Sequence, residues 1–122
     1  MAGRFEEGLT AVAEGIAIAE ETGERLYEAR LLRLKGELLL ALDSANAAAA
    51  ERCLRDAIEA SSRQSTKIFQ LRATTSLARL LAKQGKRGEA RAMLAEIYNW
   101  FTEGFDTADL KDAKALLDEL NA

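Results

Sequence analysis

A pattern of small and large apolar residues recurs three times along the chain, and it limits the possible folds more than any other sequence feature. Each copy has a small residue, a larger apolar residue four positions later, and a second small or apolar residue three positions after that. The copies are Gly8/Val12/Gly15, Ala50/Leu54/Ala57 and Ala90/Leu94/Ile97. Their first residues lie 42 and 40 positions apart (8 to 50 and 50 to 90), within the range of stacked helix pairs. The pattern therefore predicts a tandem helical repeat.

A second, shorter pattern precedes the last two copies. Here a small residue is followed three positions later by a leucine, as Gly36/Leu39 and then as Ala78/Leu81, 42 positions further on (36 to 78). Two helices approach closely only where side chains are short, and large residues then fill the space between neighbouring pairs. We therefore expect each of these segments to be the partner helix of the segment that follows it.

The composition is that of a folded helical protein. The 122 residues include no proline, 48% are hydrophobic and 30% are charged, and alanine, leucine, glutamate and arginine, all strong helix formers, dominate. Apolar residues at helical spacing predict six helices, at about 4–21, 24–42, 46–63, 66–83, 88–102 and 107–121, with glycine stops at Gly23 and Gly85. In the second helix we expect Leu31, Leu34 and Leu38 to face inward.

The repeat residues resemble the tetratricopeptide (TPR) family, whose pattern is W-x2-L-G-x2-Y, then A-x3-F, then P. The matching positions are Leu32, Gly36, Leu39, Ala50 and Leu54 in one copy, and Ala78, Leu81, Gly85, Ala90 and Leu94 in the next. Thr74 replaces the family's tryptophan, and the terminal proline is absent from both copies. The resemblance implies an all-α, antiparallel helix-pair solenoid with a C-terminal capping helix. The missing aromatics and a period of about 41 rather than 34 leave a HEAT-like pairing as the alternative.

Residues 3–40, and the chain from about Thr74 onward, are similar to a narrower group. These are the C-terminal repeat regions of large bacterial signalling proteins that join a nucleotide cyclase or a DNA-binding regulator to a STAND-type ATPase core. The resemblance implies one domain over 1–122, as a fragment of such a protein: 4–22 is the second half of a truncated repeat, 24–63 and 66–102 are repeats, and 107–121 is the cap. Any ATPase or cyclase activity would then belong to other parts of the parent protein.

Charge and residue types argue against several classes of function. The net charge is −3, with no run of five like charges, which disfavours nucleic-acid and membrane-surface binding. No histidine and a single cysteine, Cys53, are present, so the usual zinc sites and Ser/His or Cys/His catalytic pairs are excluded. We expect no enzyme activity, no cofactor and no metal, a cytoplasmic location, and a Cys53 that packs in the core.

In TPR proteins the first helices of the pairs line a concave face that binds ligands, and the resemblance assigns that role to 24–42 and 66–83. The expected groove residues are Arg30, Arg33, Glu37, Arg72, Thr75 and Arg79. Arginine forks bind carboxylates bidentately, so an acidic or C-terminal peptide is the expected ligand. The family's carboxylate-clamp asparagines are missing, which argues against binding of chaperone tails. The alternative is that these are ordinary solvent-facing charges.

The first helix is expected to mediate self-association, because its apolar stripe has no preceding partner helix. The stripe consists of Phe5, Leu9, Val12 and Ile16, with Ile18 beside it. A two-fold interface would bury it, so we predict a homodimer. A separate aromatic cluster, Tyr98, Trp100, Phe101 and Phe105, is either core or interface. Overall, the sequence predicts a protein-interaction module that binds a protein or peptide; the alternative is a purely structural, oligomerising domain.

Overall fold

The computed structural model describes residues 2–23, 25–63, 67–104 and 107–121, without the side chains of 2–5, 25–27 and 62–63. Within these ranges the chain is helical and contains no strand, which confirms the all-α prediction. The elements are α1 (Ala2–Thr22), α2 (Arg25–Leu42), the 3-10 turn η1 (Ser44–Asn46), α3 (Ala47–Arg63), α4 (Lys67–Lys83), α5 (Arg87–Tyr98) and α6 (Ala108–Asn121). None of the helices in these ranges is both long and apolar enough to cross a membrane.

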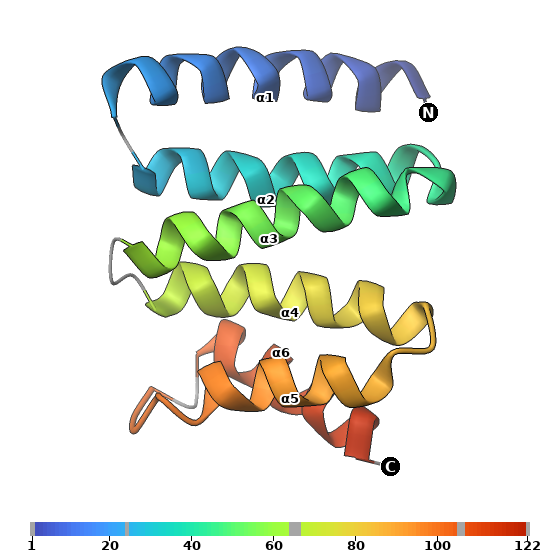
Figure 1. Cartoon of the computed structure of the whole chain (residues 1–122), viewed down its shortest axis with the longest axis vertical. Helices are drawn as coiled ribbons and strands as arrows, with labels where there is room; N and C mark the ends of the chain where they lie inside the picture. Colours follow the sequence, from blue (N-terminus) through green and yellow to red (C-terminus); the bar gives the residue numbers. More distant parts are fainter. Residues whose placement is uncertain (1, 24, 64–66, 105–106, 122) are drawn as a thin grey trace.

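The helices follow one another in a stack. Figure 1 shows α1 to α5 in chain order, each running opposite to the one before it, with α6 lying obliquely behind α5. Besides its neighbours in sequence, α2 contacts α4, and α4 contacts α6. Helices α2, α4 and α6 are therefore neighbours in space although a helix separates each from the next in sequence.

Local sequence signals account for three of the element ends. Gly23 and Gly85, just beyond α1 and α4, have φ of +75° and +82°, a left-handed conformation that glycine adopts without strain. Asp43 caps η1, because its Oδ1 accepts a hydrogen bond from the Ala45 amide at 2.9 Å. The two glycine stops agree with the sequence analysis.

Helix α5 ends at Tyr98, so the predicted end at 102 is wrong. The Trp100 amide donates to the Ile97 carbonyl and the Phe101 amide to the Tyr98 carbonyl. These hydrogen bonds span three residues rather than four, and such tightening is common at the end of an α-helix. At the start of α6 the Thr107 hydroxyl donates to the Gly104 carbonyl at 2.8 Å, and the Thr107 carbonyl accepts from the Lys111 amide.

The main core is formed by α3 to α6. Its fully buried large side chains are Leu54, Leu71, Leu77, Leu81 and Leu94, so the prediction that Leu54 is buried is confirmed. Gly36 of α2 packs against the same region, because a Cβ atom added there would lie 3.0 Å from Leu54 Cγ and 3.2 Å from the Ala50 carbonyl oxygen. The close approach expected at Gly36 is thus present between α2 and α3.

One expected inward residue of α2 faces solvent instead. Leu31 and Leu38 contact α1 at Gly15 and Gly8, whereas Leu34 is 41% exposed. Positions 31 and 38 point in nearly the same direction, but position 34 is turned by about 60° because each residue advances the helix by about 100°. Helix α1 therefore covers Leu31 and Leu38 and leaves Leu34 uncovered.

Candidate functional site

A polar hollow of about 250 Å³ lies where α2, α4 and α6 meet. Its lining residues are Arg33, Glu37, Arg72, Thr75, Ser76, Arg79, Asp109 and Asp112. Five of the six groove residues expected from the sequence are among them. Arg30 is not: it lies near the ring of Phe69, with its Cζ atom 5.9 Å from the ring centroid.

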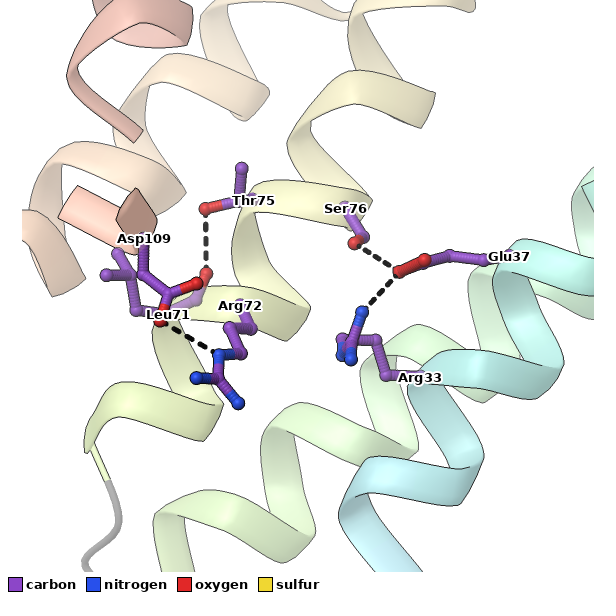
Figure 2. A network of polar contacts seen from close by, with 7 residues as sticks. All are labelled: Arg33, Glu37, Leu71, Arg72, Thr75, Ser76 and Asp109. Atoms are coloured by element: carbon purple, nitrogen blue, oxygen red, sulfur yellow. Dashed lines mark hydrogen bonds and ion pairs between the residues drawn. The ribbon is translucent and has the colours of Figure 1, made fainter. Parts of the chain in front are cut away.

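Glu37 connects α2 to α4 in this hollow (Figure 2). Arg33 Nη1 lies 2.7 Å from Glu37 Oε2, and the Ser76 hydroxyl donates to the same oxygen at 3.0 Å. Arg33 and Glu37 are four residues apart on one helix, whereas Ser76 is 39 residues further along the chain than Glu37. The Glu37 carboxylate thus has one charged and one neutral donor, and its negative charge is balanced within the hollow.

Arg72 connects α4 to α6. Its Nε donates to Asp109 Oδ2 at 2.9 Å, as Figure 2 shows, and its Cζ lies 5.3 Å from the Phe69 ring centroid. Both partners of this ion pair are partly exposed, and such pairs stabilise folded proteins by about 1 kcal/mol or less. The contact therefore orients the guanidinium more than it stabilises the fold.

The two remaining groove residues expected from the sequence, Thr75 and Arg79, differ in whether their polar groups are free to bind a ligand. The Thr75 hydroxyl donates to the Leu71 carbonyl at 2.8 Å, and Thr75 is 5% exposed, so its donor is already used inside α4. The Arg79 side chain is exposed, and no described residue forms a hydrogen bond or an ion pair with it. Arg79 is thus the arginine of this hollow that is available to a ligand.

A second, larger hollow of about 450 Å³ adjoins the first. Glu37, Ser76 and Arg79 line both. The second hollow is otherwise lined by the apolar residues Leu40, Ala47, Leu54 and Leu80 and by Ser44, Lys83 and Gln84. Together the two hollows form a groove, called the α2/α4 groove below, whose polar half reaches α6 and whose apolar half reaches the start of α3.

Sequence reasoning did not identify several groove residues. Asp109 and Asp112 lie on the predicted capping helix, and helical spacing gives no signal that this helix crosses α4. Leu40 and Leu80, which line the apolar half, were not among the groove residues expected from the sequence either. Only the packing of α4 against α6 shows that an acid of α6, Asp109, balances an arginine of α4, Arg72.

Some of the residues expected for self-association are already buried by contacts within the chain. Val12 is 4% exposed, so it offers little surface to a partner. Leu9 and Ile16 are half-buried, and Ile18 is 57% exposed. The side chain of Phe5 lies outside the described residues.

The aromatic cluster divides into buried and exposed members. Tyr98 and Phe101 are partly buried against the main core, whereas Trp100 is 57% exposed. The Trp100 and Phe101 rings meet edge to face with centroids 5.2 Å apart, and Lys67 Nζ lies 5.6 Å from the Trp100 centroid. Phe105 is outside the described residues. Trp100 also borders a shallow hollow of about 280 Å³ lined by Ile58, Met93 and Ile97 among others.

Cys53 is buried, as expected for a core residue. Burial raises the pKa of its thiol, and the nearby positive charge of Lys35 acts in the opposite direction more weakly. A raised pKa keeps the thiol protonated and unreactive at neutral pH. Across the part of the chain that the structure describes, no cluster of three or more histidine, cysteine, aspartate or glutamate side chains is placed to hold a metal ion.

Comparison with known proteins adds no further information. The chain matches no protein-family model, and no curated protein or solved structure matches it significantly. The interpretation of the site therefore depends on the chain's own residues and their geometry.

Proposed function

We propose that this chain is a protein-interaction module of the TPR type, which holds a peptide or a neighbouring domain in the α2/α4 groove. One feature of its architecture, the way α2 and α4 lie against each other, supports the proposal. Helices α2 and α4 contact each other at a constant offset of 39 residues, because Arg30 lies near Phe69 and Glu37 accepts from Ser76. A regular offset of this kind is expected when the first helices of successive pairs lie side by side.

The observation that carries the proposal is the groove itself. It is lined by four helices, α2, α3, α4 and α6, and combines an apolar half with charged side chains that are already oriented by Glu37 and Asp109. Binding sites in proteins are typically concave, with an apolar lining and a few oriented polar groups. Side chains held in place before binding lose less conformational entropy when a ligand arrives. The resemblance of residues 3–40, and of the chain from about Thr74 onward, to the repeat regions of bacterial signalling proteins favours a partner within such a protein, in the cytoplasm.

Short random peptides displayed on phage and selected on the immobilised protein would test this function. Selected peptides would be synthesised with a dye, and their affinities measured by fluorescence anisotropy. Ala47→Leu extends a side chain into the apolar half of the groove and should weaken binding roughly tenfold or more, equivalent to about 1.4 kcal/mol. Ala92→Leu is the matched control, because Ala92 is exposed on α5 away from the groove.

Two results would contradict the proposal. One is that selection enriches no peptide above background. The other is that Ala47→Leu and Ala92→Leu bind the selected peptides equally well, although circular dichroism shows both variants to be folded.

A structural, oligomerising role is the second candidate, and an exposed side of α1 favours it. Ile18 is 57% exposed, Leu9 and Ile16 are half-buried, and within the described part of the chain α1 contacts α2 alone. A homodimer through this helix would remove these side chains from water. Sedimentation velocity at micromolar concentration should then show a dimer that Leu9→Glu and Ile18→Glu convert to monomer. A sharp monomer of about 13.3 kDa for the wild type would exclude this candidate.

A further inference from the structure

We infer that the α2/α4 groove recognises an internal segment of an acidic peptide, in which a large apolar side chain lies within two positions of an aspartate or glutamate. This inference rests on the proposed function and names its ligand chemistry. Three observations carry it: the charges left without a partner in the groove, the apolar hollow beside them, and the continuity of the groove past Arg79.

The first observation concerns charge. Arg33 is paired with Glu37, and Arg72 with Asp109, so intramolecular ion pairs already neutralise the charges of these two arginines. Arg79 has no such partner among the described residues. Lys83, one helical turn further along α4, also lines the groove and is likewise unpaired in the described part of the chain. Like charges four residues apart on a helix repel each other, and a carboxylate between them relieves this repulsion while forming charge-assisted hydrogen bonds.

The second observation concerns the apolar half of the groove. A hollow of about 450 Å³ is lined by the apolar side chains of Leu40, Ala47, Leu54 and Leu80. Arg79 and Lys83 line the same hollow. An apolar side chain that fills it loses its contact with water, which is the main source of affinity in such sites. The ligand must therefore present an apolar side chain and a carboxylate close together.

The third observation concerns the direction of the ligand chain. Arg79 and Ser76 line both hollows, so Arg79 lies at the junction of the two halves of the groove. A peptide that occupies both halves has residues on both sides of the carboxylate bound to Arg79. In the polar half, Asp109, Asp112 and the paired arginines offer both acceptors and donors, which suits a peptide backbone. An internal acidic side chain fits this arrangement better than a C-terminal carboxylate, which would end at the junction.

The peptides selected for the proposed function provide the test. We expect them to contain leucine, phenylalanine or another large apolar residue with aspartate or glutamate within two positions. The affinity of a selected peptide should fall roughly tenfold or more with Arg79→Glu, and similarly when the peptide's own acid is changed to the corresponding amide. Arg52→Glu is the matched control: Arg52 is an exposed arginine of α3 outside both hollows, and the same change in net charge should alter the affinity less than roughly twofold.

A second arm distinguishes internal from terminal carboxylates. A peptide truncated directly after its acidic residue should bind more weakly than the continuous peptide, because it leaves the polar half of the groove empty. Equal or tighter binding of the truncated peptide would overturn the inference, as would selected peptides that lack an acid or do not respond to Arg79→Glu. If such peptides still lose affinity with Ala47→Leu, the proposed function stands and only the ligand chemistry is wrong. Failure to select any peptide would contradict both.

Discussion

Helix α1 contacts only α2 within the described part of the chain, whereas α4 contacts α2, α3, α5 and α6. The two helices also use different residues. At the α1–α2 contact, Gly8 and Gly15 receive the ends of Leu38 and Leu31, and Ile18 remains exposed. Helix α4 buries eight side chains, including three fully buried leucines. A repeat pattern thus produces a dense core only where helices cover it on several sides.

The first two copies of the repeat pattern differ in how well their surroundings are buried. Val12 in the first copy and Leu54 in the second are both buried. However, the apolar residues beside Val12, Leu9 and Ile16, are only half-buried, and α1 has one neighbour. Leu54 joins a core cluster that continues through α4, α5 and α6. The pattern therefore predicts which residue faces a partner helix, but the number of neighbouring helices sets how much of the surrounding surface is buried.

The largest effect is expected from emptying the centre of the dense region. Leu54→Ala should lower the free energy of unfolding by about 2 to 5 kcal/mol, because it removes buried contacts and leaves a cavity. Leu34→Ala is the matched control, since it deletes the same atoms from a 41% exposed site and should change stability by only about 0.5 kcal/mol. Urea unfolding measures both. Equal effects of the two changes would show that the two regions are not differently packed.

Hydrogen exchange compares the two regions directly. Amides in the middle of α1 should be at least roughly tenfold less protected than those of α4, equivalent to about 1.4 kcal/mol, because α1 can separate from α2 without opening the main core. Mass spectrometry of exchanged peptides at neutral pH gives these values. Similar protection of α1 and α4 at low protein concentration would contradict the comparison, whereas protection of α1 that grows with concentration would indicate a dimer.

Replacing glycines with alanine compares how tightly helices pack at the α2–α3 contact and at the α1–α2 contact. At Gly36, an added Cβ meets the Ala50 backbone oxygen and Leu54, so overpacking of about 1 to 3 kcal/mol should outweigh a gain in helix propensity of about 1 kcal/mol. Gly36→Ala should therefore destabilise the protein. Gly15→Ala meets only the Leu31 side chain, which can move, so its cost should be smaller.

Gly88→Ala is the control for these replacements. An added Cβ at Gly88 in α5 meets no other part of the protein within 4 Å beyond its own stretch of helix backbone, so the change should stabilise the protein by up to about 1 kcal/mol. Thermal melts of the three variants check the order. A stabilising Gly36→Ala would show that α2 and α3 are not in close contact there.

The smallest effect is expected from the titration of Cys53. Burial raises its pKa in the folded protein, so the folded state holds the thiol proton more tightly than the unfolded state does. The resulting stability is complete below the pKa of the unfolded chain, about 8.5, and is lost as the pH rises through the folded value. Urea midpoints measured across this range should decline more for the wild type than for Cys53→Ala. Identical pH slopes would show that the thiol is not desolvated.

Local sequence rules were sufficient for much of this fold. Apolar spacing predicts the six helices, Gly23 and Gly85 terminate two of them with positive φ, and the small residue Gly36 marks a close helix contact. These features depend on residues within one or two helical turns of one another, so the amino-acid types alone determine them. Leu34 shows the limit of such rules, because an apolar stripe does not reveal how wide a face the neighbouring helix covers.

The candidate site depended on tertiary structure. Its charged residues come from three helices: Arg79 and the pairs Arg33/Glu37 and Arg72/Asp109. The hydrogen bonds that join α4 to α6 and to α2 connect residues 37 and 39 positions apart in the sequence. Whether such residues meet depends on how each helix is rotated about its axis and at what angle it crosses its neighbours. The packing of the apolar faces sets this geometry, and the helical period of the sequence does not specify it. The sequence by itself therefore determined the helices, the two ends that Gly23 and Gly85 mark, and the apolar stripes that helices use at their contacts. Only the tertiary structure decided which charges neutralise one another and which, like Arg79, remain available to a ligand.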